Sequence, residues 1–138
     1  MKLNELTIVA AQKGLRDHKF SSVELTQACL ERIKERNPRL NAFITIAEES
    51  ALQEARQADK LIADKKSGIL TGIPFAVKDA ICTKDIRSTG AAKILDNYVP
   101  PFDATVIKKI RDAGGVIVGK SNCDAFGHGA SNENSMYG

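Results

Sequence analysis

Lys78 closes a short apolar run and is the residue of this sequence best placed for proton-transfer chemistry. The run is Gly72-Ile73-Pro74-Phe75-Ala76-Val77, and Asp79 follows Lys78 at once. A strand of this length is normally buried on both faces, so a lysine at its end either reaches solvent or lies in a partly dry site. Only a site that disfavours the ammonium form lets a lysine accept a proton. The flanking residues alone favour the solvated alternative, because most lysines are solvated.

A second group of candidates lies in the polar run over residues 127–135. His128 could carry a proton, and the spacing is compatible with a Ser-His-Asp arrangement of Ser131 or Ser135 with His128 and Asp124. No G-x-S-x-G turn accompanies these residues, so nothing specific supports such a triad. An isolated histidine in a loop is more often a hydrogen-bond partner.

The cysteines and histidines predict neither a disulfide framework nor a metal site. Cys29, Cys82 and Cys123 are odd in number and widely spaced, and no C-x-x-C or H-x-x-x-H frame involves His18 or His128. Cys82 and Cys123 follow predicted strands, where a nucleophile could stand. The sequence offers them no recognisable basic partner.

One segment formally matches the phosphate-loop pattern G-x-x-x-x-G-K-[ST]. It is Gly114-Gly115-Val116-Ile117-Val118-Gly119-Lys120-Ser121. A phosphate loop needs a strand before its first glycine and a flexible loop across the variable positions. Here a helix is predicted before Gly114, and three consecutive residues favour a strand. We interpret Gly114-Gly115 as a helix end and Gly119-Lys120 as the exit of a strand, and we predict no ATP binding here.

Composition excludes several classes of protein. The 138 residues are 43% hydrophobic and 27% charged, which is typical of one soluble globular domain. The net charge is only +3, without a polybasic block, and there is no Trp, so a nucleic-acid surface is not indicated. No apolar run could span a bilayer, and the start of the chain is too charged for a signal peptide. We therefore expect a cytoplasmic protein without membrane contact.

The first half of the chain is predicted to be mainly helical. Ser21 and Glu24 have the spacing of a capping box, and Pro38 predicts that the helix they begin stops before Asn37. Small residues at helical spacing predict close packing of the next helix. The expected elements are a helix over 3–14, a helix over 21–36, a strand over 42–46 and a helix over 47–65 with Ala51, Ala55, Ala58 and Ile62 on one face.

The second half changes to an alternation of strands and helix. Strands are predicted over 75–77 and 116–118, with a helix over 104–113 between them, capped by Asp103 or Thr105. A strand, helix and strand in this order favour parallel pairing. Sites in such folds lie at the carboxyl ends of the strands.

Several of these segments together resemble the amidase signature family. Residues 72–79 resemble the strand that carries the family's catalytic lysine. The branch most similar to this chain is that of the A subunits of bacterial glutamyl-tRNA(Gln) amidotransferases, which residues 93–106, 119–122 and 133–135 resemble. The first 65 residues fit in helix order. Departures from the usual pattern of that branch are Cys123, Ala125, His128 and Asn132.

The resemblance implies an α/β fold in which N-terminal helices precede part of a mixed, mainly parallel sheet of an α/β/α amidase-signature domain. Residues 1–138 would form a single incomplete domain, with a helical segment over 1–65 and the start of the catalytic core over 66–138. It also implies a Ser, cis-Ser, Lys triad, in which the lysine corresponds to Lys78. The two serines would follow Gly138, so the chain alone is expected to be inert.

The implied function is that of a glutamine amidase that supplies ammonia for the conversion of Glu-tRNA(Gln) to Gln-tRNA(Gln). In such a complex the B subunit would bind ATP and Mg²⁺, the C subunit would bridge the other two, and tRNA would be met only through the complex. No cofactor is expected in this chain. Gly129 and Ser131 are expected to contact the substrate. Two alternatives remain: a general amidase of the same family, and a non-catalytic module whose first three helices bind a partner while Lys78 stays solvated.

Overall fold

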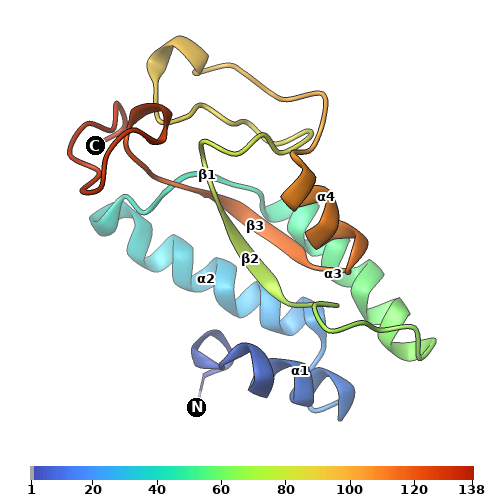
Figure 1. Ribbon diagram of the computed structural model, residues 1–138. Helices are drawn as coiled ribbons and strands as arrows, with labels where there is room; N and C mark the ends of the chain where they lie inside the picture. The colour runs from blue at the N-terminus through green and yellow to red at the C-terminus, as the bar shows by residue number, and fades with distance from the viewer. Residues whose placement is uncertain (1) are drawn as a thin grey trace.

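The computed structural model describes residues 2–138, which form a small mixed sheet with helices on both faces (Figure 1). The order of strands is β1-β3-β2; β2 runs parallel to β3 and β1 runs antiparallel to it. The elements are η1 (Leu3–Glu5), α1 (Ile8–Arg16), α2 (Ser22–Leu40), β1 (Phe43–Ile46), α3 (Glu48–Ala63), β2 (Pro74–Lys78), η2 (Lys93–Leu95), α4 (Thr105–Asp112), β3 (Val116–Ser121) and η3 (Ala125–Gly127). The α/β class and the parallel pair that the sequence predicts are confirmed.

Alternate residues of β3 pack against different helices. Val116 and Val118 meet the long helices, where Leu30 of α2 and the small residues of α3 form one core cluster. Ile117 faces the opposite layer and packs with Val77 and with Ile107 of α4. The small Ala51, Ala55 and Ala58 are buried as predicted, which lets α3 lie close to α2 and the sheet. The two layers hold β3 at the centre.

A bulge in β3 decides the direction of the residues that follow it. Phe75 pairs with Ile117, but the next residue of β2, Ala76, pairs with Gly119, so Val118 is the extra residue. Such a bulge reverses the alternation of side chains along a strand. Lys120 is thereby placed on the face of Val77 instead of the face of Val118. The prediction that Gly119-Lys120 is the exit of the strand is wrong, because the ladder continues to Ser121.

The prediction that the second helix ends before Asn37 is also wrong, since α2 includes Pro38 and runs to Leu40. Proline removes one N–H donor but is tolerated in the last turn when other contacts hold the helix end. Here Asn37 bonds the main chain of Phe43 twice, at 2.7 and 3.0 Å. Asn41, in the left-handed conformation, ends the helix by donating its N–H to Asn37 O at 2.7 Å.

The N-termini of α1, α2 and α4 agree only in part with the capping residues that the sequence predicts. The capping box of Ser21 and Glu24 is present, as predicted. The first predicted helix is interrupted: Thr7 caps α1 through the Ala10 N–H, and Val9 is 74% exposed instead of facing the core. Neither Asp103 nor Thr105 caps α4, whose N-cap is Ala104 without a side-chain bond.

Asp103 does not cap α4 and instead bonds Lys84 and Arg111. Its carboxylate accepts hydrogen bonds from Lys84 N at 2.7 Å and from Arg111 at 2.9 Å. This joins the segment after β2 to α4. Among residues 2–138, each helix is too short or too polar to span a bilayer.

Candidate active site

Lys78, the residue predicted to take a proton, stands at the carboxyl end of β2 with an exposed side chain. A Cβ atom at Gly127 would lie 3.4 Å from Lys78 Nζ, which is van der Waals contact, so the backbone at Gly127 lies directly beside the amine. No side chain or carbonyl within residues 2–138 forms a hydrogen bond or ion pair with Nζ. The amine is therefore accessible to a group that approaches from outside these residues.

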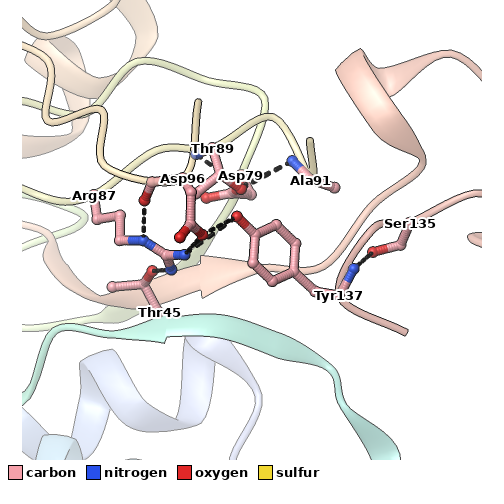
Figure 2. Close-up of polar contacts among 8 residues, drawn as sticks. All are labelled: Thr45, Asp79, Arg87, Thr89, Ala91, Asp96, Ser135 and Tyr137. Atoms are coloured by element: carbon pink, nitrogen blue, oxygen red, sulfur yellow. Dashed lines mark hydrogen bonds and ion pairs between the residues drawn. The ribbon is translucent and has the colours of Figure 1, made fainter. Parts of the chain in front are cut away.

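Asp79 has opposite surroundings, although it is the next residue. It is 1% exposed, and its Oδ2 accepts hydrogen bonds from Thr89 N at 3.0 Å, Thr89 Oγ1 at 2.5 Å and Ala91 N at 3.1 Å (Figure 2). Its Oδ1 has no hydrogen-bond partner among the described residues. Asp79 thus forms no ion pair with Lys78, in agreement with the opposite faces expected for adjacent strand residues.

A buried lysine lies close to Asp79 and was not identified from the sequence as a site residue. Lys120 is 0% exposed, and its Nζ donates to Ile81 O at 2.8 Å and to Ser88 Oγ at 2.5 Å. Burial lowers the pKa of Lys120 to about 8, against the opposing influence of Asp79 and of the Cys82 and Cys123 thiols. The sequence feature that could have identified Lys120 is its position directly after the apolar run Val116-Ile117-Val118, where the strand was predicted to end.

Cys82 and Cys123 thus do have a basic neighbour, contrary to what the sequence indicated. Cys123 is nevertheless 2% exposed, and burial raises the pKa of its thiol. A thiol with a raised pKa is a poor nucleophile at neutral pH. The environment of Cys123 is that of a core residue.

Residues 122–138, called loop 122–138 below, are fastened to the segment after β2 by a polar cluster around Arg87. Arg87 donates to Asp96 Oδ1 at 2.5 Å, to Tyr137 Oη at 3.2 Å and to Thr45 Oγ1 at 3.2 Å (Figure 2). The Tyr137 hydroxyl also donates to Asp96 Oδ1. Hydrogen bonds from Tyr137 and Arg87 lower the pKa of Asp96. The cluster joins three segments that are distant in sequence.

The two residues predicted to bind substrate lie in loop 122–138. Gly129 passes so close to Asp124 that a Cβ atom would lie 2.5 Å from its Cγ, so a larger residue there would force the Asp124 side chain to move. Ser131 is exposed and donates to Glu133 Oε2 at 2.7 Å. Neither forms a hydrogen bond with Lys78. Substrate binding by these two residues stays a prediction.

The alternative Ser-His-Asp triad is not assembled. Ser135 Oγ donates to Asn122 Oδ1 at 2.7 Å, and His128 is exposed without a side-chain hydrogen bond to any described residue. Asp124 is buried against Gly129. No group of three or more His, Cys, Asp or Glu within residues 2–138 is arranged to hold a metal ion.

A family model described as Amidase matches residues 24–138 of the sequence. The chain belongs to the amidase family. Within this family, the chain is 49% identical over 136 residues to the A subunit of the glutamyl-tRNA(Gln) amidotransferase of Coxiella burnetii (strain RSA 493 / Nine Mile phase I), covering 99% of the chain. The corresponding A subunit of Dehalococcoides mccartyi (strain ATCC BAA-2100 / JCM 16839 / KCTC 5957 / BAV1) is 50% identical over 135 residues, covering 98%. This amidase chain spans 28% of the length of these relatives.

Solved structures support the same fold. The native peptide amidase from Stenotrophomonas maltophilia matches with a TM-score of 0.83 and 32% identity over 88% of this amidase chain and 26% of that protein. The 6-aminohexanoate cyclic dimer hydrolase matches with a TM-score of 0.86 and 26% identity over 100% of this chain and 27% of that one. The arrangement of β2, β3 and their covering helices is therefore an amidase arrangement.

Proposed function

We propose that this chain contributes the proton-relay lysine, Lys78, to the glutamine amidase component of a tRNA-dependent amidotransferase. One observation carries the proposal. The Lys78 amine has no partner within residues 2–138, while the adjacent Asp79 is buried and bonded elsewhere. The similarity to two A subunits at about half identity favours the tRNA-dependent branch.

In this proposal, neutral Lys78 accepts the proton of a serine hydroxyl through a bridging serine. The serine oxygen forms a bond to the carbonyl carbon of the glutamine side-chain amide, and the carbon–nitrogen bond breaks. The proton returns through the lysine to the leaving nitrogen, which departs as ammonia. Water then hydrolyses the ester to release glutamate and regenerate the serine. Gly129 and Ser131 would help to line the substrate pocket.

The Lys78 side chain is exposed at the carboxyl end of β2. A lysine acts as a base only where its surroundings disfavour the ammonium form, and the Lys78 side chain is exposed among residues 2–138 instead of enclosed. No serine within residues 2–138 is hydrogen-bonded to Lys78. We propose that the 138-residue chain alone does not hydrolyse amides, and that it works in the cytoplasm with the B and C subunits of the amidotransferase, of which the B subunit binds ATP and Mg²⁺.

A chimera tests the proposal. This chain would replace the matching 136 residues of the Coxiella burnetii A subunit, expressed with the B and C subunits of the same complex, and glutamate release and Gln-tRNA(Gln) formation would be measured. We expect both activities in the chimera and their loss, by about a thousandfold or more, in Lys78→Ala. Lys84→Ala, at an exposed lysine, is the matched control and should retain activity.

The same measurements distinguish the alternatives. Release of ammonia from free amides without Gln-tRNA(Gln) formation would favour a general amidase, which the likeness to peptide amidase supports. A chimera whose activities survive Lys78→Ala would contradict the role of this lysine and favour a partner-binding module. Amide hydrolysis by the isolated chain, lost in Lys78→Ala, would contradict its inertness.

A further inference from the structure

Two buried charged groups occupy the end of the sheet, and the proposed chemistry uses neither. We infer that Lys120 and Asp79 are positioning residues that hold loop 122–138 in place beside the Lys78 amine. The inference rests on the proposed function of Lys78. It is carried by a continuous series of contacts that leads from Lys120 to Gly127.

The first contacts fix the segment that follows Lys78. Lys120 Nζ, fully buried in β3, donates to the carbonyl of Ile81 at 2.8 Å and to Ser88 Oγ at 2.5 Å. Ser88 Oγ in turn donates to Ile86 O at 2.9 Å. The ammonium group of Lys120 thus ties both ends of the segment 81–88 to strand β3.

Asp79 fixes the next part of the same segment. Its Oδ2 accepts the N–H groups of Thr89 and Ala91 and the Thr89 hydroxyl, and its main-chain oxygen accepts the Gly90 N–H at 3.3 Å. A buried carboxylate and a buried ammonium are costly to desolvate unless their hydrogen bonds are well made. Both groups here bond to the same short segment, residues 81–91, whose path is therefore tightly determined.

Loop 122–138 rests on this segment. The N–H of Phe126 donates to Gly90 O at 2.6 Å, and the N–H of Met136 donates to Ala91 O at 3.0 Å. Gly127, the next residue after Phe126, is the one whose Cβ would lie 3.4 Å from Lys78 Nζ. A displacement of residues 88–91 would therefore move the backbone that lies against the Lys78 amine.

The 138-residue chain itself provides the test. We would compare the wild type with Lys120→Met and with Ser88→Ala, which removes one partner of the ammonium. Lys108→Met, at an exposed lysine paired with Asp112, is the matched control. Two quantities would be measured where each variant is folded: the amide resonance of Gly127, and the rate at which trinitrobenzenesulfonate modifies Lys78 at each pH from about 7 to about 10. Peptide mapping would separate Lys78 from exposed Lys13, the internal reference.

We expect Lys120→Met and Ser88→Ala to shift the Gly127 resonance and to change the rate of Lys78 modification by about threefold or more. Lys13 should react as in the wild type, and Lys108→Met should alter neither quantity. A folded variant that loses stability but leaves Gly127 and the pH profile of Lys78 unchanged would overturn the inference. If Lys120→Met does not fold, the same two measurements on Ser88→Ala test the inference. Amide hydrolysis is not measured, so this result is independent of the chimera experiment.

Discussion

Lys78 and Asp79 are adjacent in the sequence but lie in opposite environments at the end of β2. The lysine is exposed beside Gly127, whereas the aspartate is 1% exposed and accepts three hydrogen bonds from Thr89 and Ala91. The aspartate therefore holds the structure around the site, and the lysine amine remains without a neutralising partner among residues 2–138.

Asp79→Ala should lower the free energy of unfolding by about 3 kcal/mol, because it leaves two buried N–H groups and a hydroxyl without their charged acceptor. Urea denaturation monitored by circular dichroism measures the change. Asp112→Ala, at an exposed aspartate of α4, should change stability by less than about 0.5 kcal/mol. Equal effects of the two substitutions would contradict the anchoring role of Asp79.

The buried ammonium of Lys120 predicts a specific dependence of stability on pH. Its pKa is about 8 in the folded chain and 10.5 as the ordinary value, so between these values the unfolded chain binds more protons. The free energy of unfolding should therefore rise with pH across this window, by about 3 kcal/mol from this group alone. Below about pH 8 the full penalty for the buried charge applies.

Denaturation of the wild type and of Lys120→Met at several pH values isolates this contribution, since all other groups are common to both. The difference between the two unfolding free energies should change in favour of the wild type as the pH rises. A pH-independent difference between the two proteins would show that Lys120 titrates alike in the folded and unfolded chains.

Gly119→Ala should destabilise the sheet strongly. A Cβ atom at Gly119 would collide with the carbonyl oxygen of Thr45 in the neighbouring strand, and backbone cannot yield as a flexible side chain can. We expect a loss of more than about 2 kcal/mol in thermal or urea unfolding. Gly68→Ala, where the nearest atom is 3.8 Å away, should be neutral or slightly stabilising. Similar stabilities for the two variants would contradict the close approach of β1 and β3.

Gly127→Ala should disturb the backbone that lies beside Lys78. The added methyl group would stand 3.4 Å from Nζ, and the residue has a positive φ of 72°, which costs alanine about 1 kcal/mol. In the chimera, amidase activity should fall about tenfold or more. Gly68→Ala is again the control. Unchanged activity in Gly127→Ala would mean that the backbone conformation at Gly127 does not matter for the lysine.

The fold was predictable where one local signal decided the outcome. Ser21 with Glu24 marked the start of α2, and the apolar runs marked β2 and β3. Pro38 misled because the bonds of Asn37 to Phe43 and of Asn41 to Asn37 keep the last turn helical. The Asp103 cap predicted for α4 failed because its carboxylate is engaged by Lys84 and Arg111, and the Thr105 cap failed because Thr105 is already the first helical residue.

The candidate site was likewise predictable only where a local sequence pattern decided it. The sequence by itself determined the amidase family and the strand that ends at Lys78, because these follow from residue order and local conformation. Only the tertiary structure decided that Lys120 turns inward, that Asp79 bonds residues 89 and 91, and that Gly127 lies against Lys78. These features depend on a bulge at Val118 and on contacts between segments far apart in the chain. Burial and hydrogen bonding at such junctions are properties of the packed chain, and no local pattern encodes them.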